Sequence, residues 1–377
     1  MLEYLQIKNY KNFLNFEIDD LARINLIAGK NNTGKTSFLE ALSVFFSEGD
    51  PVVLREILSG RGELSAKLMA ASDSHTELNF IALKSLFNNR NSGSFRQEIE
   101  ITGFTKMNDS SNKVEIVNQI NPVEIVSMSF VSIDSDLSDK LNAVKEKEIE
   151  YQSNINQNEP GFLVISKGKS KVFLLNKNFL FRPAILDGEK VHPFRLVRTI
   201  SNDDQLNARL FDSIALTDDE EAVAEALKII DDRIERIAFV DQGYMERKPV
   251  VKIKGESAKI PLRSLGEGVN RIFAIILSLV NARNGCLLID EAENGLHYSV
   301  QELLWKVILS TAHKLNVQVF ATTHSSDCIY GFSQALQSFP EISGKLFRFD
   351  IKSGSPVVTS FNREELSLAS LSQIEIR

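Results

Sequence analysis

Four short motifs follow one another in a fixed order along this chain, and the first of them constrains the fold most. Gly29 to Thr36 reads Gly-Lys-Asn-Asn-Thr-Gly-Lys-Thr and matches the phosphate-binding pattern G-x-x-x-x-G-K-[ST]. The apolar run Ile24 to Ala28 before it predicts a buried strand, and Lys35 to Phe46 after it predicts a helix. A strand, a glycine-rich loop and a helix in this order are the context that a phosphate-binding loop requires.

The glycine-rich loop predicts a nucleoside triphosphate as ligand. Its glycines allow backbone N–H groups to curl around phosphates, and the positive end of the helix dipole adds to their effect. Lys35 is expected to reach the outer phosphates, and the Thr36 hydroxyl is expected to bind Mg²⁺. The alternative, a chance glycine-rich turn before an amphipathic helix, is disfavoured by the matching flanks. The residues predicted to bind nucleotide here are Gly29, Asn31, Asn32, Thr33, Gly34, Lys35, Thr36 and Ser37.

A second apolar run ends in two adjacent carboxylates. Gly285 to Ile289 predicts a central parallel strand, and Asp290 and Glu291 follow at its carboxyl end, where open α/β sheets bind ligands. This is a Walker B pattern. Asp290 is expected to hold Mg²⁺ through water, and Glu291 is expected to polarise the attacking water as general base. Taken alone, Asp-Glu after an apolar run could instead begin a helix.

The remaining motifs complete a resemblance to a known group of proteins. Ile260 to Gly268, with the sequence Ile-Pro-Leu-Arg-Ser-Leu-Gly-Glu-Gly, resembles the signature segment of the ABC-class P-loop ATPases of the OLD (overcoming lysogenization defect), RecF and SMC group. The resemblance implies ATP as ligand and a head in which the signature of one subunit closes over nucleotide held by another. A helix-capping turn is the alternative for this segment. Besides the loop, the implied nucleotide-binding residues are Ser264, Gly266, Glu267 and Gly268.

The same resemblance assigns a catalytic role to a histidine. Val317 to Ala321 predicts one more strand, and Thr322-Thr323-His324 follows it. A lone histidine is usually structural, but His324 takes the place of the γ-phosphate-sensing histidine of ABC ATPases. Glu291 and His324 are therefore the predicted catalytic residues.

At three further positions the resemblance leaves alternatives open. Asn9 to Phe13 is similar to the Asn-Phe-Arg-Ser-Phe segment of the family, with Lys11 in place of an arginine that lies near the nucleotide. A solvated strand residue is the alternative for Lys11. His297 replaces an aspartate of the transporters, and its role stays open. Gln97 and Gln119 both remain candidates for the Q-loop glutamine.

The order of the motifs predicts a single split head over residues 1–377. Residues 1–76 form the phosphate-loop half, 240–377 form the half with the signature, Walker B and histidine motifs, and 77–239 form a β-lobe with a helical insertion. The expected fold class is α/β, an ABC-ATPase head with a central, mostly parallel sheet flanked by helices, plus an antiparallel β-lobe and a short helical insertion.

The middle of the chain gives local predictions of its own. Alternating apolar and polar residues from Glu77 to Val131 predict antiparallel sheet, and Phe162 to Phe181 predicts a hairpin. Leu141 to Tyr151 and Asp218 to Arg236 predict helices, the second of them amphipathic, and Ile237 to Val240 predicts a strand.

Composition narrows the class of protein. Hydrophobic residues make up 43 % and charged residues 25 %, as in ordinary globular proteins, and no apolar run reaches the ~20 residues of a membrane span. We therefore expect a cytoplasmic protein without a membrane partner. Cys286 and Cys328 lie in or beside predicted strands and are expected to be core residues in a reducing compartment.

Three functions compete at this point, and the first is favoured. It is a stand-alone OLD-like ATPase of a bacterial anti-phage defence or toxin system that forms a homodimer or higher homo-oligomer and controls a separate effector, a nuclease or toxin. The resemblance suggests this because the 53 residues after His324 are too few for the Toprim nuclease domain of OLD proteins.

The second function is a RecF-like or SMC-like DNA repair ATPase that acts directly on DNA, and the third is a transporter subunit, which the divergent signature disfavours. Nucleic acid is a candidate partner because basic residues cluster twice in this acidic chain, although solvated strand faces are the favoured explanation of both clusters. The clusters are Lys167, Lys169, Lys171, Lys177 and Arg182, and Arg247, Lys248, Lys252 and Lys254.

The phosphate-loop assignment predicts that Lys35→Ala abolishes ATP binding, because the substitution removes the ammonium group expected on the outer phosphates. Equilibrium binding of a fluorescent ATP analogue measures this. Unchanged affinity in the variant would refute the assignment.

Overall fold

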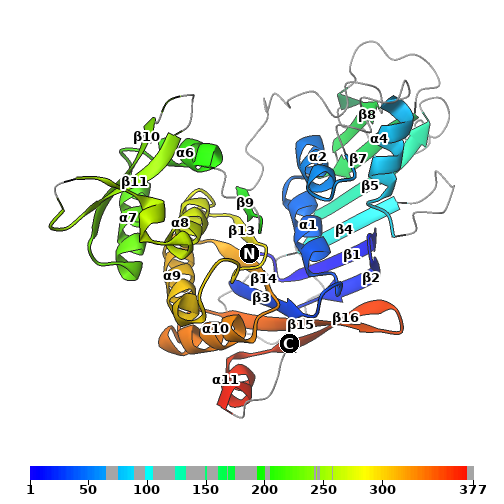
Figure 1. The fold of residues 1–377 in the computed structure, drawn as a ribbon. Helices are drawn as coiled ribbons and strands as arrows, with labels where there is room; N and C mark the ends of the chain where they lie inside the picture. Colours follow the sequence, from blue (N-terminus) through cyan, green and yellow to red (C-terminus); the bar gives the residue numbers. More distant parts are fainter. Residues whose placement is uncertain are drawn as a thin grey trace, which may run out of the picture. The chain divides into compact units, whose positions relative to one another are not determined.

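The computed structural model describes residues 1–64, 75–88, 98–104, 124–132, 149–150, 160–167, 169–174, 193–199, 204–241, 243, 247–256 and 258–371. These residues form two compact units (Figure 1). The first comprises Met1–Leu21, Glu40–Val191 and Ile351–Val357, and the second comprises Ala22–Leu39, His192–Asp350 and Val358–Arg377. One boundary falls inside helix α1 (Lys35–Phe46).

The second unit is built on a six-stranded sheet with the order β16-β15-β3-β14-β13-β9. The five strands from β15 to β9 are parallel to one another. Every residue of the strands β3, β13 and β14 is buried, as expected for central strands covered on both faces. The strand bounds are β3 Ile24–Gly29, β9 Phe194–Val197, β13 Cys286–Ile289, β14 Gln318–Thr323, β15 Gly344–Lys352 and β16 Ser355–Phe361.

Helices pack against the side chains of this sheet and bury them. Leu26, Leu287 and Val319 belong to one large core cluster with side chains of the helices α8 (Glu267–Val280), α9 (Gln301–Lys314) and α10 (Ser326–Ser338), which lie together in Figure 1. On α1, Phe38 packs edge-on against Phe320 of β14 and Phe349 of β15. The phosphate-loop helix is thereby attached to the sheet through aromatic contacts.

Smaller elements complete the second unit. A three-stranded antiparallel sheet contains β10 (Ile234–Asp241), β11 (Arg247–Ile253) and β12 (Ile260–Pro261), and helices α6 (Asp204–Asp212) and α7 (Asp218–Ile230) precede it. The 3-10 turns η1 (Leu262–Leu265) and η2 (Tyr298–Val300) and helix α11 (Arg363–Leu371) are the remaining described elements. Cys286 and Cys328 are buried and free, and burial raises the pKa of both thiols, that of Cys328 to about 12.

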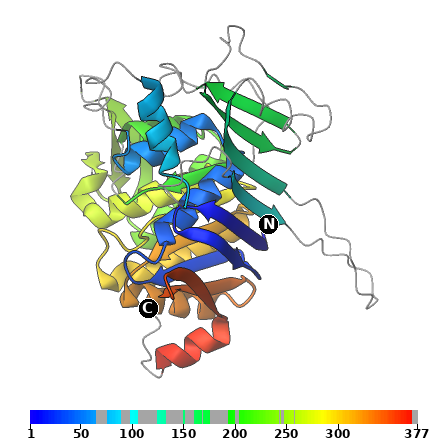
Figure 2. The ribbon, with the colours of Figure 1, turned by 90° about the vertical axis from the view of Figure 1, so that its right-hand side faces the viewer.

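The first unit contains a seven-stranded sheet with the order β2-β1-β4-β5-β7-β8-β6, whose strands run from dark blue to green in Figure 2. All of its strand pairs are antiparallel except β6 with β8. Helices α2 (Pro51–Gly60) and α4 (His75–Lys84) belong to the same unit. The strands are β1 Tyr4–Tyr10, β2 Phe13–Ile18, β4 Glu98–Phe104, β5 Glu124–Ser132, β6 Ile149–Glu150, β7 Pro160–Ser166 and β8 Lys169–Leu174.

The predicted fold class is confirmed, with a central, mostly parallel sheet flanked by helices and a separate antiparallel sheet. The predicted hairpin corresponds to β7 and β8 over its described residues. Within the described residues no helix is long and apolar enough to cross a membrane. Gln97, Gln119, Lys177 and Arg182 lie outside the described residues.

Three local predictions were wrong. Helix α4 replaces the strand expected from Glu77, because Asn79, Ala82 and Leu83 are buried together at helical spacing. Helix α7 ends at Ile230 rather than Arg236, because the Asp231 carboxylate binds the Arg233 guanidinium and turns the chain into β10.

The third correction concerns the helix expected from Leu141 to Tyr151. Ile149–Glu150 is strand β6, which pairs in parallel with β8. That pairing joins distant residues and leaves no local sequence pattern. The rest of the expected helix lies outside the described residues.

Strands β9 and β13 approach each other so closely that Gly285 tolerates no side chain. A Cβ atom there would lie 1.7 Å from the Pro193 carbonyl oxygen. We predict that Gly285→Ala destabilises the protein by about 3 kcal/mol or more, because backbone atoms cannot move aside as a side-chain tip can. Urea denaturation measures this. Gly354→Ala is the control, since its Cβ meets nothing within 4 Å and only the positive φ of 81° opposes it, at about 1 kcal/mol.

Candidate functional site

Three neighbouring strands deliver the predicted motifs to one edge of the six-stranded sheet. Strands β3, β14 and β13 are adjacent and parallel, so their carboxyl ends meet. The glycine-rich loop follows β3, His324 follows β14, and Asp290 and Glu291 follow β13. The sheet therefore brings together residues from positions 29 to 324, all of them in the second unit.

The loop between β3 and α1 is closed around its own lysine. The Lys35 ammonium donates hydrogen bonds to the Gly29 carbonyl at 2.6 Å and to the Lys30 carbonyl at 2.8 Å. The Thr33 hydroxyl donates to the Lys30 carbonyl at 2.9 Å. At Gly29, φ is 149° and a Cβ would lie 2.4 Å from the Phe349 carbonyl oxygen, so only glycine fits. Two backbone carbonyl groups of the loop thus accept the hydrogen bonds of the ammonium group.

Exposure differs along this loop. Asn31, Asn32 and Thr36 are exposed, whereas Thr33, Gly34, Lys35 and Ser37 are buried. Burial lowers the pKa of Lys35, and the negative charges of Glu293, Glu291 and Asp290 oppose that effect. One buried cation therefore lies in the field of three carboxylates, a charge arrangement suited to binding a metal-nucleotide complex.

Asp290 connects three segments through its carboxylate. Its Oδ1 accepts hydrogen bonds from the Thr322 hydroxyl at 2.8 Å and from the Thr36 hydroxyl at 3.3 Å. Its Oδ2 accepts from the Thr199 hydroxyl at 3.3 Å. The two predicted magnesium ligands, Thr36 and Asp290, are thus neighbours in space.

Glu291 has an unusual backbone conformation, with φ at 50°. This left-handed conformation costs a residue other than glycine about 1–2 kcal/mol. The Glu291 N–H donates to the Thr322 hydroxyl at 2.9 Å, and this bond fixes the turn. The Glu291 carboxylate, 37 % exposed, then lies 3.8 Å from Nδ1 of His324. The two predicted catalytic residues are therefore side by side.

Two charged residues at this site were not predicted. Arg271, buried on α8, donates to the Arg198 carbonyl at 2.7 Å and to the Asp290 carbonyl at 3.1 Å. Burial lowers its pKa, and the surrounding carboxylates oppose this. Glu293 is also buried, and its Oε1 lies 3.1 Å from Nδ1 of His324. Arg271 stands among apolar residues of a predicted helix, and this pattern could have indicated a buried role for it. No sequence pattern singles out Glu293 or Thr199.

The predicted signature surrounds the start of helix α8. Ser264 lies in η1, Gly266 has φ of 110° and precedes the helix, and Glu267 and Gly268 begin it. Ser264, Gly266 and Glu267 are exposed, and the N-cap residue Gly266 has no side chain with which to cap the first turn. A helix N-terminus in this state can accept an anion from outside the chain.

Lys11 lies in the first unit, in the turn between β1 and β2. Its side chain is 5 % exposed and its Nζ lies 3.8 Å from Oε2 of Glu40 on α1. The alternative of a solvated strand residue is therefore wrong. Arg61 contacts the same buried carboxylate, with Nε 2.7 Å from Oε1.

His297 is exposed and caps its own turn, with Nδ1 2.9 Å from the Ser299 hydroxyl and its ring against Tyr298. Three of the described basic residues considered for nucleic acid are shown in ion pairs, and for Lys167 the distance from Nζ to the Glu48 carboxylate is 2.7 Å. Arg247 binds Asp212, and Lys252 Nζ lies 3.1 Å from the Glu235 carboxylate.

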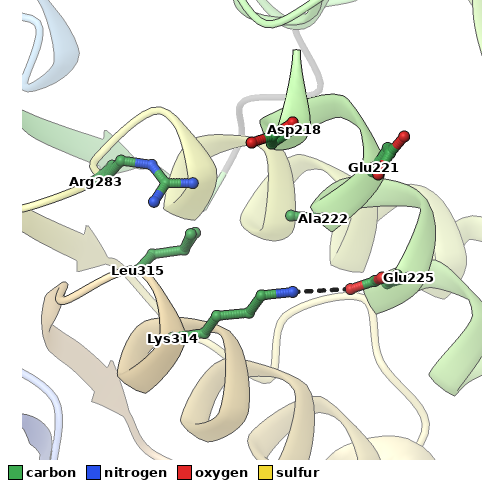
Figure 3. Close-up of a pocket in the computed structure, with 7 residues that line it drawn as sticks. All are labelled: Asp218, Glu221, Ala222, Glu225, Arg283, Lys314 and Leu315. Carbon is green, nitrogen blue, oxygen red and sulfur yellow. Dashed lines mark hydrogen bonds and ion pairs between the residues drawn. The ribbon is translucent and has the colours of Figure 1, made fainter.

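A pocket elsewhere in the second unit contains none of the predicted site residues (Figure 3). Two of its lining residues form ion pairs. Lys314 Nζ lies 3.0 Å from the carboxylate of Glu225, which also lines the pocket, and Arg283 binds Asp219. Its lining is therefore already neutralised in part. The lining residues are Asp218, Glu221, Ala222, Glu225, Arg283, Lys314 and Leu315.

The Thr322 hydroxyl forms hydrogen bonds with both Walker B carboxylate residues, with the side chain of Asp290 and the backbone N–H of Glu291. We therefore predict that Thr322→Val lowers kcat about tenfold. Valine keeps the volume but leaves Asp290 and the Glu291 N–H without this hydroxyl, and loss of such a supporting group costs 10-fold to 100-fold. Steady-state ATP hydrolysis measures this. Thr323→Val, equally buried on the same strand, is the control and should retain activity within about twofold of wild type. Equal activity of the two variants would contradict the assigned role.

Comparison with known proteins identifies the family of the chain. Residues 24–327 match the AAA_21 family, described as "AAA domain, putative AbiEii toxin, Type IV TA system". The chain is similar to the ATP/GTP phosphatase of Helicobacter pylori (strain ATCC 700392 / 26695), with 26 % identity over 368 residues and 89 % of each chain covered.

A shorter similarity links the chain to the DNA double-strand break repair Rad50 ATPase of Archaeoglobus fulgidus, with 45 % identity over 56 residues, 15 % of this chain and 6 % of that protein. Among solved structures, the SmcHead bound to the C-winged helix domain of ScpA is similar in fold, with a TM-score of 0.50, 12 % identity, and 96 % and 98 % of the two chains covered. The chain therefore belongs to the AAA_21 family of P-loop ATPases and has the fold of an SMC head.

Proposed function

We propose that two copies of this chain enclose ATP between them, with the phosphate loop of one copy and the signature segment of the other on each nucleotide. The exposed Ser264 and Gly266 at the start of α8 support this, because the N-terminus of a helix binds phosphate and the N-cap glycine leaves it open to a partner's nucleotide. Symmetry then places two such sites in one dimer.

The observation that carries the proposal is the convergence of Thr36, Asp290, Glu291 and His324 from three strand ends. The hydroxyl of Thr36 and the carboxylate of Asp290 are hard oxygen donors 3.3 Å apart, which suits Mg²⁺. Within the described part of the chain no cluster of three or more His, Cys, Asp or Glu could hold a metal. Mg²⁺ needs no such cage, because nucleotide phosphates and water complete its shell.

The chain's own groups then divide the work of hydrolysis. Lys35 would leave its loop carbonyls for the outer phosphates, and Mg²⁺, held by Thr36 and Asp290, would neutralise phosphate charge. Glu291 would take a proton from the attacking water, which bonds to the γ-phosphorus while the bond to the ADP oxygen breaks. His324 would contact the γ-phosphate from the adjacent strand end.

The biological role we infer is that of the sensor or scaffold subunit of a bacterial anti-phage defence or toxin system, with a nuclease or toxin as separate effector. The family description, which names a toxin of a type IV toxin–antitoxin system, supports this class. The similarity to a phosphatase of ATP and GTP over 89 % of both chains supports hydrolysis as the driving step.

DNA repair is the second candidate, and the similarity to the Rad50 ATPase favours it. That similarity covers 15 % of this chain, so it supports shared ATPase chemistry more than a shared partner. Salt-sensitive, ATP-stimulated binding to duplex DNA would distinguish the repair role.

We predict that Glu291→Gln keeps ATP binding but lowers kcat at least 100-fold, because the amide cannot accept the proton from water. The variant should therefore accumulate as an ATP-bound dimer. Hydrolysis assays and native mass measurements with and without Mg-ATP, after purification with the products of neighbouring genes, test both points.

Three outcomes distinguish the two proposed roles and test the function of Glu291. An ATP-dependent assembly that retains a neighbour-encoded protein supports the sensor role, and an ATP-dependent dimer that retains only DNA supports repair. Wild-type turnover in the variant would contradict the role of Glu291. The Lys35→Ala protein is the negative control, since it should remain monomeric with ATP.

A further inference from the structure

We propose that Glu293 positions His324 for catalysis, so that the Nε2 side of the imidazole faces the nucleotide. This inference rests on the proposed function, in which His324 contacts the γ-phosphate. Glu293 itself would touch neither substrate nor metal. It would act through the histidine alone.

The contacts of Glu293 fix both ends of the His324 residue. Oε1 of Glu293 accepts a hydrogen bond from the backbone N–H of His324 at 2.9 Å. The same oxygen lies 3.1 Å from the imidazole Nδ1. Because one carboxylate oxygen meets both the backbone and the ring, it determines the position of the residue and the rotation of its side chain.

The contact with the ring also bears on which ring nitrogen is available. A carboxylate only accepts hydrogen bonds, so a hydrogen bond across the 3.1 Å between Oε1 and Nδ1 places the proton on Nδ1. Nε2, on the opposite side of the ring, is then left for the nucleotide. The His324 side chain is 50 % exposed, so this side has room for a ligand.

Glu291 does not compete for this role. Its Oε1 is 3.8 Å from Nδ1, beyond hydrogen-bonding distance. Its side chain is 37 % exposed, whereas that of Glu293 is 9 % exposed. The two carboxylates thus have separate tasks, since the exposed one can reach water and the buried one can hold the histidine.

The burial of Glu293 requires a reason beyond packing. A buried carboxylate is costly unless it is paired, and Oε2 of Glu293 is buried without a hydrogen-bond partner. A carboxylate kept in the interior in contact with both the backbone and the ring of His324 matches a positioning role for the active site.

The test compares four variants in steady-state ATP hydrolysis: His324→Ala, Glu293→Ala, Glu293→Gln and the double variant with both alanines. We expect Glu293→Ala to lower kcat 10-fold to 100-fold with KM within about threefold of wild type, as for loss of a supporting group. Glu293→Gln keeps an acceptor oxygen and should recover most of that loss. The double variant should be no slower than His324→Ala, because Glu293 acts through the histidine.

A spectroscopic measurement separates positioning from general damage. The chain has five histidines, so imidazole ¹⁵N signals can be assigned by substitution. We expect His324 to carry its proton on Nδ1 in the wild type and in Glu293→Gln, and to lose that preference in Glu293→Ala.

The outcomes distinguish this inference from the proposed function. If His324→Ala hydrolyses ATP at the wild-type rate, the proposed role of His324 is wrong. If His324→Ala is slow but Glu293→Ala is not, only the role of Glu293 is overturned. Equal losses in Glu293→Ala and Glu293→Gln, or additive losses in the double variant, would also overturn it.

Discussion

The carboxylate of Asp290 is the group on which the rest of the site depends. It accepts hydrogen bonds from three hydroxyl groups, those of Thr36 after the loop, Thr322 on β14 and Thr199 after β9. These three segments are far apart in the chain, and the parallel order of the sheet brings their carboxyl ends together. One side chain therefore sets the position of the phosphate loop relative to the neighbouring strand ends.

Charge balance is the second constraint. Asp290, Glu291 and Glu293 follow one strand within four residues, and two buried cations compensate them. Lys35 does so from the loop, and Arg271 does so from the signature helix, where it donates to the Asp290 backbone. The segment proposed to meet a partner's nucleotide is thus joined by a hydrogen bond to the segment proposed to act on the chain's own nucleotide.

Local patterns predicted much of this arrangement. The strand and helix around the phosphate loop were correct at Ile24 and from Lys35 to Phe46, because apolar periodicity and the glycine loop agree there. Prediction failed where burial or strand pairing depends on residues far away in the sequence, as in α4 and β6. The individual roles of the predicted site residues stay predictions, although the structure shows which of them lie together.

The sequence by itself determined the phosphate loop, the Walker B strand and the class of chemistry, because short motifs with fixed spacing carry them. Only the tertiary structure decided which groups surround the carboxylates. Thr199, Arg271 and Glu293 reach the site from β9, α8 and the turn after β13, through hydrogen bonds that depend on strand order and helix packing. Lys11 shows the same limit, since its partner Glu40 lies on a different element and no spacing in the sequence predicts their ion pair.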